Sequence, residues 1–239
     1  MSFYADENAR KKLRHLPLAG KKSGKVDSLI LDMKKTPQTD TQSVWDHGVA
    51  VSEKYKELIS YLRGDSKLTS EWKMPDWVED NKKFILDNLY PDDIMRQYHV
   101  HHDCGKPNCI EYDEEGRKHF PNHSQVSYDT YLDVFGSEGS NQTIADLIKH
   151  DMDVHMMKAA DVEEFCNEMG TKKAVSLLIT ALCEIHANAD MFGGLRSISF
   201  LSKFKNMKKR GKAIINFLKE KNNDNQRANQ RDGEVAEAI

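Results

Sequence analysis

Apolar residues recur at helical spacing along most of the chain. One stripe consists of Val44, Val51, Tyr55, Leu58 and Leu62, whose separations of three, four and seven residues place them on one face of an α-helix. A similar stripe runs from residue 174 to residue 185. No segment shows a convincing alternation of apolar and polar residues, which a half-buried strand requires. Further helices are predicted over residues 77–89, 92–103, 123–135, 143–151, 161–169 and 200–218, with Pro, Gly and Asn clusters between them. The pattern therefore predicts an all-α fold.

The two ends of the chain lack this periodicity. Residues 1–40 mix Lys, Gly, Ser, Thr and Asp with few apolar positions, and residues 223–239 are polar and contain no aromatic side chain. A chain of 239 residues suits one domain with short additions. We therefore expect a helical domain over residues 41–222, an N-terminal extension over residues 1–40 and a disordered C-terminal tail over residues 223–239.

Histidines are concentrated in the middle of the chain. Ten are present, and seven of them lie between His99 and His155. The densest stretch, HVHHDCGKP, covers residues 99–107 and falls where a predicted helix ends, with Gly105 as its C′ residue. Neighbouring helix residues point about 100° apart, so His102 and Asp103 can share one ion only at a helix end. This position favours a metal site.

Other candidate ligands lie on or at the edge of predicted inward faces. They are His47 in the first stripe, His123 in HFPNH, His150 at the end of IADLIKHD, and Asp190 at the end of LLITALCEIHANAD. A single inward histidine is better explained as a neutral core imidazole bonded to a backbone carbonyl. Several such side chains together with a His-Asp pair instead indicate metal binding.

The ordered motifs H…HDxGKP…HFxxH…H…AD resemble the HD superfamily of metal-dependent phosphohydrolases. The likeness covers about residues 41–195 and is greatest to the HD domains of bacterial tRNA nucleotidyltransferases and of RNA end-healing phosphatases. Two departures are Ser124, where the family commonly has Glu, and Asn122, where it commonly has Gly. The resemblance implies an HD-domain helical bundle whose metal ligands are His47, His102, Asp103, His123, His150 and Asp190.

Such a ligand set predicts the kind of metal and its chemistry. Imidazoles mixed with carboxylates suit Mn, Fe, Co, Ni or Zn better than Mg, so we expect one or two divalent transition-metal ions. Asp103 is the candidate bridge between two ions, which could together activate water and bind a phosphate ester. We expect Asp103, Lys106 and His119 to be catalytic, and Lys106, Arg117 and His119 to contact the substrate.

The function expected from this resemblance is hydrolysis of phosphomonoesters or cyclic phosphodiesters of nucleotides or nucleic-acid ends, with 2′,3′-cyclic or terminal phosphates on RNA favoured. A nucleotidase or dNTP phosphohydrolase acting on free nucleotides is an alternative. A non-catalytic, metal-containing nucleic-acid-binding module is another. The sequence contains no GxxxxGK[ST] loop, so it gives no sign of kinase activity.

Charge and hydropathy add expectations about partners and location. The net charge is -3, yet both ends carry basic runs, which include residues 10–14 and residues 203–212. These runs could attract a nucleic acid, although a solvated helix face explains them more simply. No apolar run approaches the roughly 20 residues of a membrane span, and no secretory signal is recognisable. We therefore expect no membrane partner, a cytoplasmic location and four reduced cysteines.

Overall fold

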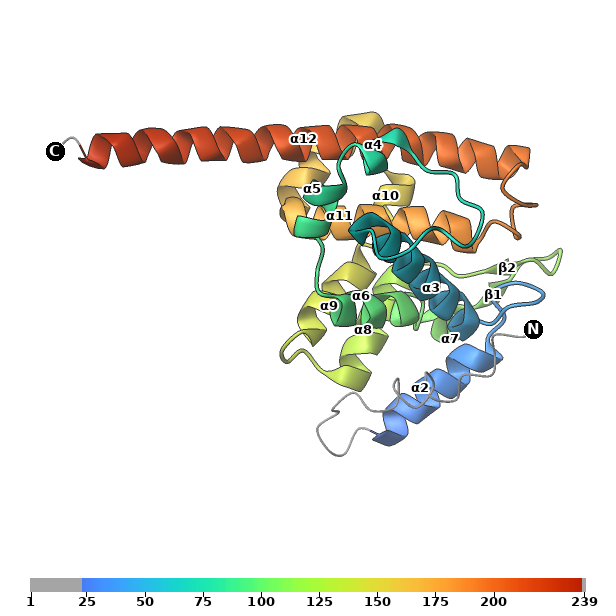
Figure 1. Ribbon diagram of the computed structural model, residues 1–239. Helices are drawn as coiled ribbons and strands as arrows, with labels where there is room; N and C mark the ends of the chain where they lie inside the picture. The colour runs from blue at the N-terminus through green and yellow to red at the C-terminus, as the bar shows by residue number, and fades with distance from the viewer. Residues whose placement is uncertain (1–22, 238–239) are drawn as a thin grey trace.

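The computed structural model describes residues 23–237, and these residues form a fold built almost entirely from helices (Figure 1). The only strands among them are β1 (Glu111–Tyr112) and β2 (Lys118–His119), which pair antiparallel with Glu111 opposite His119. The all-α prediction is confirmed, with one small hairpin that the sequence pattern did not indicate. The basic run at residues 10–14 lies outside the described residues.

The helices follow the predicted segments closely, with breaks at a few polar positions. The strongest agreement is α8, whose bounds coincide with the predicted 123–135. The segment predicted over 77–89 is divided in two around Asp80 and Asn81. The helices are α2 (Ser23–Lys35), α3 (Val44–Arg63), α4 (Asp76–Glu79), α5 (Lys82–Asp87), α6 (Asp92–His101), α7 (Lys106–Cys109), α8 (His123–Phe135), α9 (Asn141–Lys149), α10 (Asp153–Met156), the 3-10 turn η2 (Ala159–Asp161), α11 (Val162–Ala187) and α12 (Ile198–Glu237).

Helix α3 illustrates how local sequence sets the boundaries. Its N-cap Ser43 accepts a hydrogen bond from the Asp46 backbone N–H at 3.1 Å, and the Asp46 side chain accepts one from the Ser43 N–H at 3.4 Å. This reciprocal capping satisfies backbone donors that a helix start leaves unpaired. The helix ends at Gly64, whose φ of 82° requires a residue without a β-carbon.

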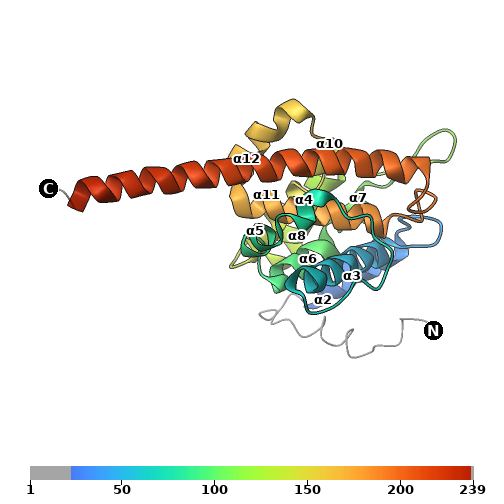
Figure 2. The same cartoon turned by 45° about the horizontal axis from the view of Figure 1, so that its top comes forward.

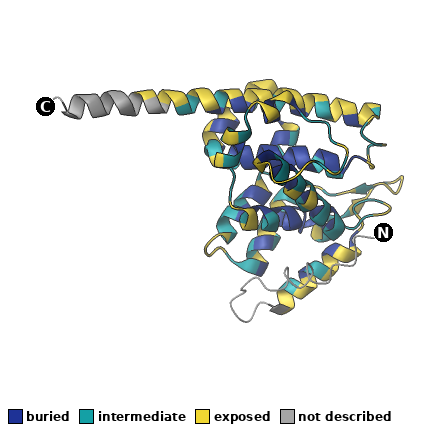
Figure 3. Cartoon of the chain, in the orientation of Figure 1, coloured by how far each residue is buried: buried dark blue, intermediate teal, exposed yellow. Residues whose placement is uncertain are grey.

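Helix α11 lies at the centre of the bundle. It packs against α3 on one side and α12 on another, while α3 packs on α6, and α6 on α9 (Figures 1 and 2). Gly170, with φ 67°, interrupts α11, so the helical part that precedes it corresponds to the separately predicted 161–169. Figure 3 shows buried residues concentrated in the inner helices and exposed residues along the outer face of α12.

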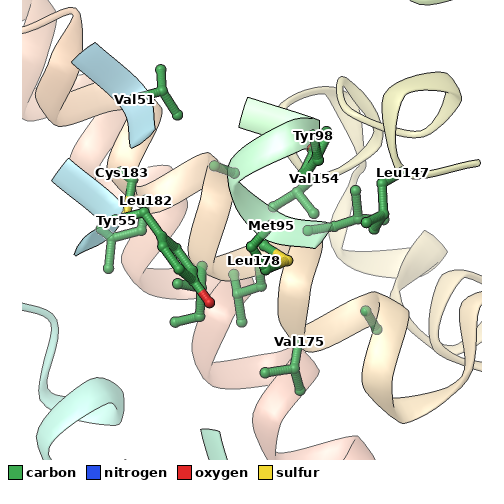
Figure 4. Packing of buried hydrophobic residues seen from close by; sticks show 14 of the residues in the cluster. Val51, Tyr55, Met95, Tyr98, Leu147, Val154, Val175, Leu178, Leu182 and Cys183 are labelled. Carbon is green, nitrogen blue, oxygen red and sulfur yellow. The ribbon is translucent and has the colours of Figure 1, made fainter. Parts of the chain in front are cut away.

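The hydrophobic core forms where four helices meet (Figure 4). Tyr55 of α3, Met95 of α6, Leu147 of α9 and Leu178 of α11 all belong to this buried cluster. Fully burying side chains of this size contributes roughly 1.5–3 kcal/mol each. The core therefore fixes the relative positions of α3, α6 and α11, the helices that carry the candidate site described below.

Helices extend into both of the end segments that lack apolar periodicity. Within the predicted extension 1–40, α2 buries Leu29 and Met33. At the other end, α12 continues as a helix to Glu237, over most of the predicted disordered tail 223–239. The first half of α12 is anchored by Trp77, which is 4% exposed and packs so closely on Gly211 that a β-carbon there would lie 2.3 Å from the indole ring.

Gly105, predicted as the C′ residue of a helix, does not have the left-handed conformation common at that position. Its φ of -86° is open to any residue, and it precedes α7 as the N-cap. Glycine is required there for space, because a β-carbon would lie 2.3 Å from the Ser127 backbone nitrogen. The Gly105 N–H also donates to the Ser127 Oγ at 2.9 Å, so the turn after Asp103 is held directly against α8.

None of the helices in the described part of the chain has both the length and the apolar composition that crossing a membrane requires.

Candidate metal centre

A close approach of α3 and α6 brings the first two predicted ligands together. A β-carbon on Gly48 would lie 2.5 Å from the carbonyl oxygen of Val100, so the helix backbones can meet only because residue 48 is glycine. The neighbouring side chains His47 and His102 consequently lie face to edge, with ring centroids 5.1 Å apart. Both are essentially inaccessible to solvent, at 0% and 2% exposure.

Glu184 of α11 completes a group that could hold a metal ion. One ligand atom from each of His47, His102 and Glu184 lies within 4.8 Å of the other two. The Glu184 Oε1 atom is 3.7 Å from the His47 Nε2 atom. The group therefore combines three helices that are far apart in sequence, as expected for a site built on a rigid bundle core.

Asp103 lies between this group and the other charged side chains of the site. Its Oδ2 atom is 3.2 Å from His102 Nε2, 3.9 Å from His47 Nε2 and 2.6 Å from Lys106 Nζ. Its Oδ1 atom faces a different residue, His123, whose Nε2 is 3.8 Å away. The two oxygens of one carboxylate thus face two separate sets of imidazoles, which is the arrangement a bridging ligand needs.

Neighbouring charges strongly shift the pKa values of Asp103 and His102. Burial alone would raise the pKa of Asp103, but the charges of Lys106, His102 and His47 hold it well below its usual range. Burial would conversely lower the pKa of His102, yet Asp103, Asp151 and Glu184 raise that pKa to about 10. A cation at the position of the His102 ring is therefore favoured by three buried carboxylates. A metal ion would benefit from the same field.

Hydrogen bonds from neighbouring residues fix the orientation of the ligands. The Nδ1 atom of His102 lies 2.7 Å from the backbone oxygen of His99, which leaves Nε2 facing Asp103. His155 Nε2 is 2.8 Å from Glu184 Oε2, which leaves Oε1 facing His47. Such outer partners hold metal-binding side chains in their binding orientation and are costly to remove.

The pairing of Asp151 adds another buried carboxylate close to the group. It accepts a hydrogen bond from the hydroxyl of Tyr98, a fully buried residue of α6. Burial and the nearby charge of Glu184 raise the pKa of Asp151. The site consequently contains one more carboxyl group than the predicted ligand set contributes.

The ligand atoms at the centre of the group have no other bonding partner among the described residues. The His47 Nδ1 and Nε2 atoms are buried without a hydrogen bond, and the His102 Nε2 atom has only its 3.2 Å contact with Asp103 Oδ2. An unpaired buried nitrogen costs roughly 1–3 kcal/mol, and coordination of an ion would relieve that cost. The donor set of imidazoles and carboxylates is also chemically suited to a divalent cation. The residues present therefore fit a metal.

Not every predicted residue joins this arrangement. The structure brings together His47, His102, Asp103, Lys106 and His123. His150 lies at the C-cap of α9, where its Nδ1 atom is 2.8 Å from Asp153. The predicted substrate contacts Arg117 and His119 lie on the β1–β2 hairpin and both pair with Asp113, at 2.8 Å and 2.9 Å.

Asp190, another predicted ligand, lies outside this group. It is exposed in the turn after α11, whereas the carboxylate in the group belongs to Glu184, six residues earlier and still within the helix. The sequence does contain a signal that Glu184 has a functional partner. Glu184 is the only charged residue between residues 174 and 187, on a helix otherwise predicted to be buried. A lone carboxylate in such a segment needs a cationic partner.

The arrangement defines a class of site: a buried cluster of imidazoles and carboxylates capable of holding a divalent cation, with a lysine beside it. Comparisons with protein-family models, with curated proteins and with solved structures found no match to this chain.

Proposed function

We propose that this protein is a metal-dependent phosphohydrolase of the HD type. The observation that carries the proposal is the buried group of His47, His102 and Glu184 around the carboxylate of Asp103, which is the residue after His102 in the HD motif. A buried, charged and incompletely bonded cluster is costly to the fold and is typical of a functional site. The ordered motifs described under Sequence analysis add the resemblance to the HD superfamily.

His47, His102, Asp103 and Glu184 would hold a first divalent ion, and His123 with the second oxygen of Asp103 would contribute to a second. The mixed nitrogen and oxygen ligands favour Mn, Fe, Co, Ni or Zn over Mg. When bound, such an ion supplies Lewis-acid chemistry, which polarises phosphoryl oxygens and makes hydroxide available near neutral pH.

Lys106 has the position to stabilise charge on a phosphoryl group. Its ammonium is buried and bonded to Asp103 Oδ2 at 2.6 Å and to Gln38 Oε1 at 3.0 Å. In a buried site, where the dielectric constant is low, a cation interacts with negative charge that develops on the phosphoryl group more strongly than it would in water. The Gln38 amide limits the motion of Lys106 and keeps its charge beside the metal ligands.

The proposed substrates are phosphomonoesters or cyclic phosphodiesters of nucleotides or nucleic-acid ends, with cyclic or terminal phosphates on RNA preferred. This choice is based on the resemblance to HD domains of RNA-processing enzymes, and therefore on analogy. The proposal assigns no catalytic role to Arg117 or His119, because both pair with Asp113 on the hairpin.

The direct test is phosphate release by the full-length protein after chelator treatment and reloading with Mn, Fe, Co, Ni, Zn or Mg. The substrates are p-nitrophenyl phosphate, 2′,3′-cyclic nucleotides, dNTPs and 3′-phosphorylated oligonucleotides. The proposal expects turnover that requires a transition metal and is fastest on cyclic or terminal RNA phosphates. Preference for dNTPs would instead support a nucleotidase, and metal binding without any turnover would support a non-catalytic module.

Asp103→Asn supplies the matched variant. The amide has the shape of the carboxylate and still offers Lys106 an oxygen acceptor, so the helices should remain folded, as checked by circular dichroism. We expect loss of both metal loading and activity. Full activity in a folded Asp103→Asn protein would overturn the proposal.

A further inference from the structure

The exposed face of α12 carries a row of lysines that the metal centre does not use. Lys205, Lys209 and Lys212, named here the α12 lysine stripe, are all exposed. They are four and three residues apart, so they share one face of the helix. The opposite face of α12 buries Met207, Ile214 and other apolar side chains against the body. The stripe therefore points away from the protein.

The charge of this region contrasts with that of the rest of the molecule. Between Ile198 and Lys221, α12 contains eight Lys or Arg residues and a single carboxylate, Glu220. Residues 23–197 contain 31 Asp or Glu and 19 Lys or Arg. Segregation of charge onto one helix creates a local positive potential that a net charge of -3 conceals.

The stripe is not neutralised by the body of the protein. Lys208 forms an ion pair with Asp76 at 2.7 Å. Lys205, Lys209 and Lys212 form no such pair with any side chain that the structure describes. The pKa of Asp76 is lowered mainly by its bond to Lys208, and Lys212 adds only a weaker charge effect. Their charges are thus available to a ligand in solvent.

We propose that the α12 lysine stripe binds the sugar-phosphate backbone of a single-stranded nucleic acid. The three lysines extend over roughly 10 Å at 1.5 Å per residue, a length that presents several phosphates of one strand. The exposed residues beside them include Asn206 and Asn216, whose amides donate hydrogen bonds to phosphate or sugar oxygens. Lysine contacts of this kind carry no base specificity.

Two features favour a nucleic acid over other polyanionic partners. A membrane-surface helix needs a long free apolar face, whereas Met207, Ile214 and Leu218 of α12 are buried against the protein body, and its large exposed apolar side chains, Ile198 and Leu201, are confined to the first turn. A protein partner would need a buried apolar or aromatic anchor, and the stripe contains none between Lys205 and Lys212.

Helix α12 itself contacts a residue that borders the metal centre. Its N-terminal end and the β1–β2 hairpin lie at the same end of the molecule in both views (Figures 1 and 2). Arg210 of α12 donates to the backbone oxygen of His155 at 2.8 Å, and His155 is the partner of Glu184. The inference goes beyond the proposed function, because binding along α12 requires no turnover at the metal centre.

The test is fluorescence anisotropy of a labelled single-stranded RNA with full-length protein in chelator, from about 50 mM to about 200 mM salt. We expect the triple variant Lys205→Gln, Lys209→Gln, Lys212→Gln to bind about tenfold or more weakly. The slope of log affinity against log salt should fall by about 2, since each contact to a single strand contributes about 0.7. Hydrolysis of p-nitrophenyl phosphate should be unchanged.

The matched control is Lys56→Gln, Lys67→Gln, Lys172→Gln, which removes the same charge from exposed positions outside α12. It should bind RNA like the unaltered protein. Equal loss in both triple variants, or no binding at the lowest salt, would overturn the inference. Binding to phosphatidylserine vesicles in preference to RNA would also overturn it. A single-stranded DNA of the same length is expected to bind similarly, because the contacts are to the backbone.

Discussion

Glu184 and Asp190 are carboxylates at the same end of α11 in very different surroundings. The side chain of Glu184 is 13% exposed and lies 2.8 Å from His155, whereas Asp190 is exposed in a turn. We expect Glu184→Gln to reduce metal loading and activity roughly 100-fold or more, because a neutral amide is a weaker ligand. Asp190→Asn should change neither.

Metal content by mass spectrometry and phosphate release together check this pair of variants. The reverse result, with Asp190→Asn inactive and Glu184→Gln active, would restore Asp190 as the ligand and reject the group described here. In chelator, both proteins should unfold at similar temperatures if the difference is due to the metal alone.

The buried imidazole of His102 makes the metal-free protein sensitive to alkaline pH. Its pKa is raised from 6.5 to about 10 by neighbouring carboxylates, despite burial. Because the folded state binds this proton more tightly than the unfolded state, the stabilisation is complete below pH 6.5 and is lost as the pH rises toward 10. His155 acts in the same direction.

Urea unfolding in chelator should therefore show the free energy of unfolding falling above neutral pH. The decline is at most about 1.4 kcal/mol per pH unit for each such group. It should be much smaller in His102→Asn. A metal ion must displace the same proton, so metal affinity should rise over this pH range. A free energy of unfolding that stays constant between neutral pH and the onset of cysteine titration would contradict the account.

At the level of single residues, the sequence was informative where a residue type is unusual for its position. His47 interrupts an aliphatic stripe, and the His102–Asp103 pair ends a helix, so both could be recognised. Asp190 was chosen because it completes a motif, but a motif gives the order of residues and not the direction of their side chains. The roles of Asp151 and His155 depend on contacts between helices, which no local pattern specifies.

Helix α3 meets α6 at Gly48, where the backbones have no room for a side chain. A methyl group there would lie 2.5 Å from the Val100 oxygen and 2.9 Å from the His99 oxygen. We expect Gly48→Ala to destabilise the protein by about 1–3 kcal/mol. It should also reduce activity, because His47 is the adjacent residue and would move relative to His102.

Gly24→Ala is the appropriate comparison for thermal or urea unfolding. A β-carbon at Gly24 in α2 has no heavy atom within 4 Å, and alanine favours a helix by roughly 0.5–1 kcal/mol over glycine. Its stability should be unchanged or slightly higher. If Gly48→Ala were as stable as Gly24→Ala, the close contact between α3 and α6 would be wrong.

At the level of elements, periodicity predicted the long amphipathic helices and missed the short or locally stabilised ones. The bounds of α8 follow directly from the apolar pattern. Helix α2 buries Leu29 and Met33 and packs Val26 against the core, a short stripe at helical spacing within residues 1–40 that the polar residues around it obscured. The β1–β2 hairpin has two residues in each strand, which is too short for an alternation to be visible.

The molecule as a whole should be unstable in mild acid because several core histidines are neutral. Burial lowers the pKa of His99 to about 3, and those of His101 and His186 to about 4. The unfolded chain binds these protons near pH 6.5, so the stability they contribute is present above that pH and is lost as the pH falls. The raised pKa of Asp151 opposes the effect.

We expect unfolding between pH 6 and 4 to take up about two to three protons, and the free energy of unfolding to fall by up to about 4 kcal/mol per pH unit. Urea titrations at several pH values measure this slope. His119→Gln, which alters an exposed histidine on the hairpin, should leave the slope unchanged. If the free energy of unfolding did not vary between pH 6.5 and 4.5, the buried histidines would bind protons as readily in the folded protein as in the unfolded chain. That result would contradict their lowered pKa values.

The contact of Trp77 with Gly211 makes the attachment of α12 visible by optical means. Trp77 is 4% exposed between α4 and α12, whereas Trp45 and Trp72 lie at other contacts and are half-buried. An indole shielded from water emits at shorter wavelength than a hydrated one, so separation of α12 from the body would shift the emission of Trp77 to the red. In a protein in which Trp45 and Trp72 are replaced by phenylalanine, that single chromophore would report whether an RNA strand bound to the lysines leaves α12 docked or lifts it from the bundle.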